Sequence, residues 1–357
     1  MIADIDRTSK GEQVTLVGER TTGEREPGDL QVGEVFVRSK GQVKTESGRS
    51  VELRRVAVGD ISTPEGKKAM LEKVEVGNQI LKDHPEWPIP DRDKDGPEPS
   101  NPVSREFFRG TMLYWKLHNV PYAEALFPLQ RPDDAGRFIP GGFVDEHAMD
   151  IFINHEDSIA IRTRGAIHEE LVSKKVIASD QEEFVAVAAG AGAGVPNIDT
   201  TVKVKEQYGK RITWTMLDTR YTSLEEAVKL AAEAGIPPED IKTQRADYRR
   251  AFRGEDESVD IFDMLGLWEY LPREQCVEVV REAYRLLKPE GVFIASNMLT
   301  TRPNLDFHQR GVEWPYVEPR EFDDLVDIIA EAGIDLGHVT MTISDEGVYA
   351  VIEIRKP

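Results

Sequence analysis

A glycine-rich segment is the first part of the sequence that could bind a ligand. Residues 190–194 read Gly-Ala-Gly-Ala-Gly and follow a continuous apolar run at 184–189, which is typical of a buried parallel strand. Glycines at such a turn let the backbone approach a ligand, and the helix that follows offers free N–H groups and partial positive charge. Because Val195 stands where the dinucleotide pattern GxGxxG has its third glycine, the spacing argues against NAD.

Two acidic residues end the next two expected strands. Asp218 follows an apolar strand at 212–217, and Asp247 follows a strand at 241–246. Ligands of an open α/β sheet bind outside the carboxyl ends of its strands, so we expect the glycines, both acids and the loop Leu265–Gly266 to line one crevice. The first acid could accept both hydroxyls of a ribose and the second an adenine amino hydrogen. The sequence therefore predicts a nucleoside site.

The elements that must position these residues fall into three parts. Residues 184–357 alternate strands and helices with short connections, which predicts a doubly wound α/β sheet. Residues 1–62 have the alternation of half-buried strands, and 84–103 has the proline and charge of an exposed linker. Ser104 is the expected cap of an aromatic helical stretch. The expected domains are a β-rich and helical lobe with its linker (1–103), a helical lid (104–176) and a ligand-binding domain (177–357).

With these motifs in this order, the chain resembles the class I S-adenosylmethionine-dependent methyltransferases over about residues 160–357. The resemblance rests on VAAGAGAG (187–194), LD (217–218), RADY (245–248), VDIFDMLGL (259–267), LLKPEGVF (286–293) and the paired terminal strands. It implies an α/β fold with a Rossmann-like, doubly wound, seven-stranded sheet whose last strand is antiparallel, plus an N-terminal β-rich and helical extension. It also implies S-adenosylmethionine as the cofactor.

The resemblance assigns roles to single residues. Gly190 and Gly192 would face the amino-acid part of the cofactor, and Asp218 would bind the ribose. The other residues expected to bind the cofactor are Arg164, whose place before the first strand suits the cofactor carboxylate, Ala191, Asp247, Tyr248, Leu265 and Gly266. One position departs from the family pattern, because Ala188 stands where an acid usually helps to orient the cofactor's ammonium group.

Methyl transfer from a sulfonium needs an in-line arrangement in a partly dry pocket more than it needs acid–base groups. A general base is required only for a hydroxyl or a protonated amine. The candidates are His308, in the irregular segment after the fifth strand, and Glu269, near the end of the fourth. The alternatives are a hydrogen-bonded surface histidine and a glutamate that pairs with Arg273.

Aromatic residues stand in two groups that could contact a substrate. Phe107, Phe108, Tyr114 and Trp115 lie at helical spacing and could pack on the sheet, on a partner subunit or around a substrate. The run Trp314-Pro-Tyr316 could contact the acceptor or anchor its own loop. A homodimer is compatible with the first group.

The composition limits the classes of partner. With 45 Lys and Arg against 65 Asp and Glu, the net charge is −20, so we expect no nucleic-acid partner. The single cysteine, Cys276, favours a reducing cytoplasmic location. We expect no membrane contact, because no apolar run reaches the ~18–20 residues of a span. The histidines His147, His155 and His168 lack the HExxH spacing, so no metal site is expected.

These patterns predict S-adenosylmethionine-dependent methylation of oxygen or nitrogen on a small molecule. Two alternatives stay open at this point. The residue Ala188 and the lack of an obvious base favour a partner subunit that binds the cofactor without activity. The glycine loop by itself would also suit an NAD-dependent oxidoreductase.

Overall fold

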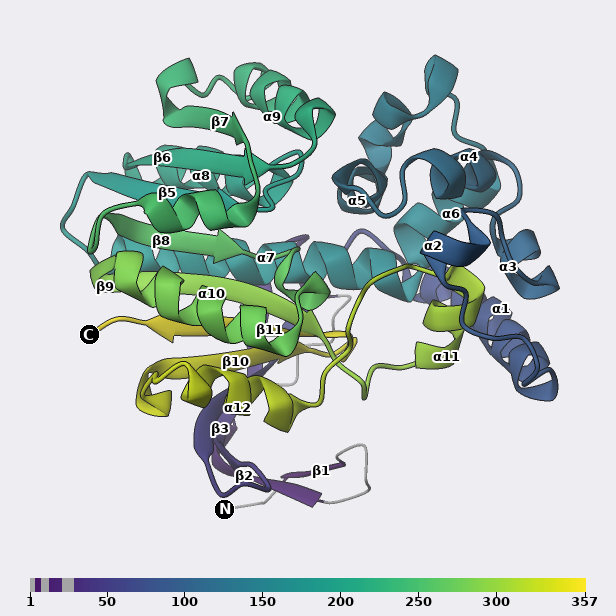
Figure 1. The fold of residues 1–357 in the computed structure, drawn as a ribbon, viewed down its shortest axis with the longest axis horizontal. Coiled ribbons are helices and arrows are strands. Elements are labelled where there is room, and N and C mark those ends of the chain that lie inside the picture. The colour runs from purple at the N-terminus through teal and green to yellow at the C-terminus, as the bar shows by residue number, and fades with distance from the viewer. Residues whose placement is uncertain (1–3, 8–12, 21–28) are drawn as a thin grey trace.

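The computed structural model describes residues 4–7, 13–20 and 29–357. The strands of this described part are β1 (Asp4–Arg7), β2 (Gln13–Arg20), β3 (Val35–Lys44), β4 (Ser50–Val58), β5 (Glu183–Ala189), β6 (Arg211–Asp218), β7 (Ile241–Arg245), β8 (Val259–Met264), β9 (Leu287–Met298), β10 (Val339–Ser344) and β11 (Tyr349–Arg355). They form one sheet in the order β1-β2-β3-β4-β10-β11-β9-β8-β5-β6-β7 (Figure 1).

The part of the sheet from β7 to β10 has the expected doubly wound arrangement. β5 pairs in parallel with β6 and with β8, and β8 pairs in parallel with β9. β11 runs antiparallel to both β9 and β10, which confirms the antiparallel last strand. The carboxyl ends of β5, β6 and β8 therefore meet at one edge, where a doubly wound sheet binds its ligands.

The N-terminal strands extend this sheet beyond the seven expected strands, β5 to β11, to eleven strands in the described part of the chain. β4 pairs in parallel with β10, from Glu52 opposite Thr340 to Val56 opposite Ser344, and β3 pairs with β4. Val51 of β4 is fully buried in the same hydrophobic cluster as residues of β8, β9 and β11. β4, and through it β3, therefore joins the sheet of the C-terminal part, because β10 lies near the other end of the chain.

The helices of the described part are α1 (Pro64–Asp83), α2 (Arg92–Asp95), α3 (Pro102–Phe107), α4 (Thr111–His118), α5 (Ala123–Gln130), α6 (Glu146–Asn154), α7 (Glu156–Ile177), α8 (Val195–Tyr208), α9 (Tyr221–Glu233), α10 (Arg273–Leu286), α11 (Leu305–Phe307) and α12 (Phe322–Glu331). A π-helical turn, His308–Val312, follows α11. Short 3₁₀ turns lie at Pro132–Phe138, Pro140–Gly142, Pro238–Asp240, Tyr248–Arg253, Trp268–Tyr270 and Leu336–His338.

These helices form two layers on the sheet and a third group beyond its edge. The apolar residues of α10 and α12 pack on one face, and those of α7, α8 and α9 pack on the other. Figure 1 shows α10 and α12 in front of the sheet, with α7 running behind it. Helices α1 to α6 gather to one side, where residues of α1, α3, α4, α5 and α6 share a third hydrophobic cluster with residues of α11 and the π-helical turn.

The segment 84–103, expected to be an exposed linker, is packed at its end. Asn101 is only 2% exposed, and its Nδ2 donates to the backbone carbonyl of Arg310 at 2.7 Å. Its Oδ1 accepts from the backbone N–H of Ser104, so Asn101 caps α3 and the expected cap at Ser104 is wrong. Proline-rich composition did not reveal this contact, because the partner lies 209 positions along the chain.

Candidate functional site

The glycine loop joins β5 to α8 in a conformation that glycine favours. Gly190, Gly192 and Gly194 have φ values of 72°, 56° and 67°, in the left-handed region. A Cβ on Gly190 would lie 2.8 Å from Cβ of Leu267, and a Cβ on Gly192 would lie 2.7 Å from Cβ of Ala123. The loop is therefore closely approached from two sides, and the missing side chains keep its backbone accessible.

A crevice of about 1040 Å³ opens beside this loop, and we call it the glycine crevice. The expected cofactor residues that line it are Arg164, Gly190, Ala191, Gly192, Asp218, Leu265 and Gly266. Further lining comes from the start of α5 and from Asp263 and Tyr270. The carboxyl ends of β5, β6 and β8 thus contribute to one ligand-sized space, as a doubly wound sheet requires.

Asp247 and Tyr248 lie outside the lining of the glycine crevice, which differs from the expectation. Asp247 uses Oδ1 to accept from the backbone N–H of Arg249 at 3.0 Å and so caps a 3₁₀ turn. The hydroxyl of Tyr248 donates to Oε1 of Gln275 at 2.8 Å, away from the glycines. β7 ends at Arg245, two residues before Asp247.

Asp218 accepts a hydrogen bond from the glycine loop and retains acceptor positions for a ligand. Its Oδ2 accepts from the backbone N–H of Gly192 at 2.9 Å, and its Oδ1 accepts from the backbone N–H of Arg220 at 2.8 Å. Each carboxylate oxygen can accept a second hydrogen bond, so two hydroxyls of a ribose could still bind. Burial raises the pKa of Asp218, and the two N–H groups oppose this rise.

An acid stands beside the position of the unusual alanine. Ala188 lies in β5 and is paired in register with Asp263 of β8. Asp263 is 4% exposed and lines the glycine crevice. Its Oδ1 accepts from the backbone N–H of Leu265 at 2.9 Å, and its Oδ2 accepts from Nδ2 of Asn197 at 2.7 Å. A carboxylate is thus present one strand away from the place where the family pattern has one.

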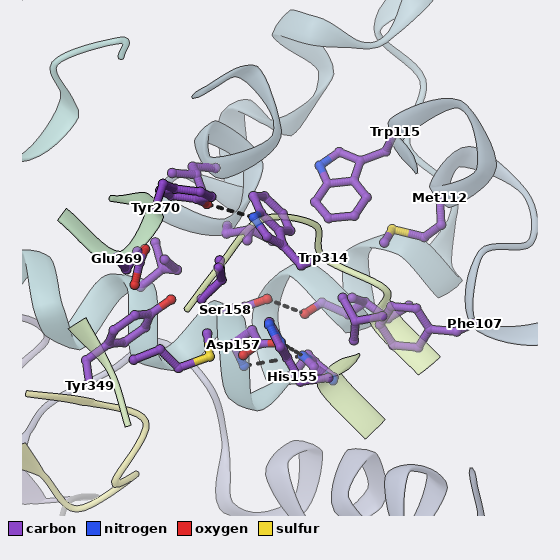
Figure 2. Close-up of a pocket in the computed structure, with 18 residues that line it drawn as sticks. Phe107, Met112, Trp115, His155, Asp157, Ser158, Glu269, Tyr270, Trp314 and Tyr349 are labelled. Carbon is purple, nitrogen blue, oxygen red and sulfur yellow. Dashed lines mark hydrogen bonds and ion pairs between the residues drawn. The ribbon is translucent and has the colours of Figure 1, made fainter. Parts of the chain in front are cut away.

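A second cavity, of about 480 Å³ with the space open to solvent included, adjoins the glycine crevice and shares Leu126 and Tyr270 with it. We call it the aromatic cavity. Figure 2 shows Trp115, Trp314 and Tyr270 on one side of it, and Tyr349, Asp157 and His155 on the other. The remaining lining residues are Phe107, Met112, Leu129, Ile151, Ser158, Ile161, Glu269, Met298, His308, Val312 and Val317.

The two aromatic groups noted in the sequence contribute to this interior. Phe107, Trp115 and Trp314 line the aromatic cavity, and Tyr316 lines the glycine crevice. Phe108 is 1% exposed and packs in the third hydrophobic cluster. Phe107, Phe108 and Trp115 therefore pack inside the molecule, whereas Tyr114 is half-buried.

Both residues considered as a general base lie in the aromatic cavity. Nδ1 of His308 is 3.0 Å from Oδ2 of Asp157. Asp157 also accepts from the guanidinium of Arg302. Burial raises the pKa of Asp157, but the charge of Arg302 and the hydrogen bond from His308 outweigh burial and hold this pKa well below its usual value. Asp157 is therefore an ionised acceptor, so Nδ1 of His308 donates to it.

Glu269 pairs with Arg164, and Arg273 pairs elsewhere, with Glu331. Nη1 of Arg164 donates to Oε1 of Glu269 and to the hydroxyl of Ser296, each at 3.2 Å. Burial raises the pKa of Glu269, and the nearby positive charge of Arg164 offsets only part of this rise. Since Arg164 lines one cavity and Glu269 the other, this ion pair lies at the wall between them.

Several buried polar atoms around the cavities have no hydrogen-bond partner among the described residues. They include Nε of Arg164, Oε2 of Glu269, and Nε2 of both His155 and His308. A buried polar atom without a partner costs free energy, so such atoms are ready to bind a polar ligand group. No local pattern pointed to Asp157, and His155 was considered only as a metal ligand. The contact between Asp157 and His308 joins residues that lie 151 positions apart in the sequence.

Comparisons with known proteins agree with this geometry. Residues 186–291 match the model of a family described as "Methyltransferase domain". No curated protein matches the chain. A solved structure from Bordetella parapertussis, described as a possible exported protein, is 16% identical with a TM-score of 0.57, and the match covers 83% of this chain and 99% of that one. This likeness shows that the fold occurs in another protein.

Two more solved structures resemble parts of the chain more weakly. Magnesium protoporphyrin IX methyltransferase from Synechocystis, with bound S-adenosylhomocysteine, is 17% identical with a TM-score of 0.42, covering 60% of this chain and 89% of that one. A 1,6-didemethyltoxoflavin-N1-methyltransferase from Burkholderia thailandensis is 17% identical with a TM-score of 0.37, covering 53% and 77%.

The family match and the sheet topology together identify a class I S-adenosylmethionine-dependent methyltransferase domain in this chain, with S-adenosylmethionine as its cofactor. The residues of the glycine crevice fit this cofactor. Asp218 has free acceptor positions for ribose hydroxyls, Arg164 has an unpartnered Nε for a carboxylate, and Asp263 supplies an acid. Among the described residues, no group of three or more His, Cys, Asp or Glu side chains could hold a metal ion. No helix in this part of the chain has the length and apolar character to cross a bilayer.

Proposed function

We propose that this chain transfers a methyl group from S-adenosylmethionine to a small molecule held in the aromatic cavity. The observation that carries the proposal is that the two cavities are adjacent and have the lining residues Leu126 and Tyr270 in common. An acceptor in one cavity and a cofactor in the other would meet at these shared residues, as an in-line transfer requires. The lining of this cavity is mostly apolar and aromatic, which suits a mostly apolar molecule.

We assign the cofactor's polar groups to three residues of the glycine crevice. Asp218 would accept from the ribose hydroxyls, and Arg164 would donate to the carboxylate. Asp263 would accept from the ammonium group, in place of the acid that the family pattern has at position 188. The register of β5 and β8 supports this last role, since it sets Asp263 directly beside Ala188. When bound, S-adenosylmethionine supplies an electrophilic methyl group on a positively charged sulfur.

His308 is the residue that we assign as general base. Its Nδ1 donates to the ionised Asp157, so Nε2 of the neutral ring is the atom free to take a proton. This Nε2 is buried without a partner among the described residues. Glu269 is already held by Arg164, and we assign it the positioning of that arginine at the wall between the cavities.

Calorimetric titration with S-adenosylhomocysteine tests the cofactor site. We expect wild type to bind, Asp218→Ala to bind at least about tenfold more weakly, and Asp247→Asn to bind as wild type does, because Asp247 lies outside the crevice. Asp263→Asn should weaken S-adenosylhomocysteine but not 5′-methylthioadenosine, which lacks the amino-acid part. If wild type does not bind, or if Asp218→Ala binds equally well, the cofactor assignment is wrong.

Transfer of a tritium-labelled methyl group to a panel of small aromatic alcohols and amines tests the reaction. His308→Asn keeps an amide N–H near the place of Nδ1 and removes the proton acceptor. It should bind S-adenosylhomocysteine normally and lose about 10²–10⁴-fold in rate. Cofactor binding by wild type with no transfer to any acceptor would favour the inactive partner subunit. Quenching of nicotinamide fluorescence on titration, with no heat from S-adenosylmethionine, would favour the oxidoreductase.

A further inference from the structure

Two histidines of the aromatic cavity are held by the same short segment of chain. His155 precedes α7, and Asp157 lies in the first turn of that helix. Nδ1 of His155 accepts from the backbone N–H of Asp157 at 3.3 Å, and Nδ1 of His308 lies 3.0 Å from the carboxylate of the same residue. The backbone of Asp157 therefore orients one imidazole and its side chain orients the other.

These two contacts require opposite tautomers. A nitrogen that accepts from an N–H carries no proton, so neutral His155 carries its proton on Nε2. A nitrogen that faces an ionised carboxylate donates, so neutral His308 carries its proton on Nδ1 and leaves Nε2 as an acceptor. Burial lowers the pKa of His155, with the charge of Asp157 opposing, and this favours the neutral ring. One Nε2 is thus a donor and the other an acceptor.

The Nε2 atoms of His155 and His308 are both available to hydrogen-bond a ligand. His155 is 2% exposed and His308 is 4% exposed, and both rings line the aromatic cavity. Neither Nε2 has a hydrogen-bond partner within the described residues. Leaving a buried donor and a buried acceptor unpaired is costly, so a ligand that satisfies both gains affinity from each.

We propose that His155 and His308 form a donor–acceptor pair that selects a hydroxyl group as the methyl acceptor. This inference rests on the proposed function and names its acceptor class: an aromatic alcohol such as a phenol. The hydroxyl donates to Nε2 of His308 and accepts from the Nε2–H of His155. The aromatic walls formed by Phe107, Trp115 and Trp314 take the ring that carries the hydroxyl.

The electron count explains why oxygen is preferred to nitrogen. The acceptor oxygen has two lone pairs: one forms the bond to the methyl carbon while the other accepts from His155. The carbon–sulfur bond breaks with its electron pair left on sulfur, and the hydroxyl proton moves to Nε2 of His308. A neutral primary amine has one lone pair, which the methyl group needs, so the N–H of His155 would be left unpaired.

The tautomers can be measured without any turnover. Long-range ¹⁵N–¹H correlation spectra of the whole protein at neutral pH, assigned with His155→Asn and His308→Asn, report which nitrogen of each ring carries the proton. We expect Nε2–H for His155 and Nδ1–H for His308. His155→Asn keeps an oxygen that can cap α7, so it should remain folded. If His155 carries its proton on Nδ1, or if either ring is doubly protonated, the proposal is overturned even where no ligand binds.

Binding of two isosteres tests the selection itself. With S-adenosylhomocysteine bound, we expect 2-naphthol to bind at least about tenfold more tightly than 2-naphthylamine, and we expect His155→Asn to abolish this preference. His338→Gln, at a partly exposed histidine of a distant 3₁₀ turn, is the matched control and should keep it. An equal preference in wild type and His155→Asn overturns the proposal. If the tautomers and the preference for 2-naphthol are as predicted but no methyl group is transferred to any acceptor, the proposed function is wrong instead.

Discussion

Charged side chains around the two cavities are buried with partners, and burial decides how each can act. Asp157 stays ionised because Arg302 and His308 contact it, whereas burial raises the pKa of Glu269 against the opposing charge of Arg164. Two carboxylates of the same cavity therefore differ in their tendency to hold a proton. The acid with the lower pKa orients a histidine, and the acid with the raised pKa pairs with an arginine at the wall between the cavities.

Lys116 offers a pH test of such burial. It is 3% exposed on α4, and its Nζ donates to the backbone carbonyls of Val312 and Glu313 beside the aromatic cavity. Burial lowers its pKa to about 8, with the charge of Glu313 opposing and that of Arg92 adding to the fall. The ordinary value is 10.5, so between the two values the unfolded chain holds a proton that the folded chain has released. Stability therefore rises with pH over this window.

The corresponding variant is Lys116→Met. We expect the free energy of unfolding of wild type, minus that of Lys116→Met, to rise by roughly 2–3 kcal/mol from pH 7 to pH 10. Urea denaturation at each pH measures this difference, and titration of other groups cancels in it. Lys68→Met, at an exposed lysine of α1, should show a flat difference. A flat difference for Lys116→Met as well would mean that burial does not lower the pKa of this amine.

The start of α5 contacts the glycine loop of the methyltransferase domain. Ala123 begins α5 and lies against Gly192, while Arg220 stacks 3.9 Å from the ring centre of Tyr122. Nη2 of Arg220 also reaches Oε1 of Glu124 at 3.4 Å. The start of α5 therefore closes one side of the glycine crevice, and a ligand bound there would lie beside this helix.

Gly192→Ala should disturb that contact in two ways. A Cβ at Gly192 would clash with Ala123, and the residue would keep a φ of 56°. We expect S-adenosylhomocysteine to bind at least about tenfold more weakly, with a loss of roughly 1–3 kcal/mol of stability. Gly209→Ala is matched for backbone strain, because Gly209 has φ of 68° and open space around it. It should lose stability without losing affinity, and calorimetry that finds equal affinities for both variants would contradict this.

Local motifs predicted most residues that line the glycine crevice. They could not predict contacts between residues that lie far apart in the sequence. The loop at 190–194, Asp218 and Leu265–Gly266 each follow a strand directly, so strand order alone predicts that they share an edge. Asp247 also follows a strand, but it turns to cap the next helical turn, which a short-range preference of aspartate explains better than a ligand does. The pairing of His308 with Asp157 has no local signal, because tertiary packing alone brings them together.

The same limit applies to the whole sheet. Alternation predicted the strands of residues 1–62 but not their partner, and β4 turns out to continue the methyltransferase sheet beside β10. Val51 and Leu53 of β4 share a hydrophobic cluster with Phe262 of β8 and Ile352 of β11. A cluster shared by residues this far apart in sequence favours unfolding of the N-terminal strands and the methyltransferase domain as one unit.

Val51→Ala tests whether the molecule unfolds as this one unit. Val51 is fully buried, so the truncation should cost roughly 1–3 kcal/mol of stability. Amide hydrogen exchange through global unfolding should then accelerate equally in β4, β8 and β9, since all three strands face the same cluster. Val185→Ala makes the same change on β5 at a valine that is 45% exposed, and it should alter exchange little. If Val51→Ala accelerates exchange in β3 and β4 alone, the N-terminal strands are an independent unit that only borders the domain, because their opening would then leave the methyltransferase core closed.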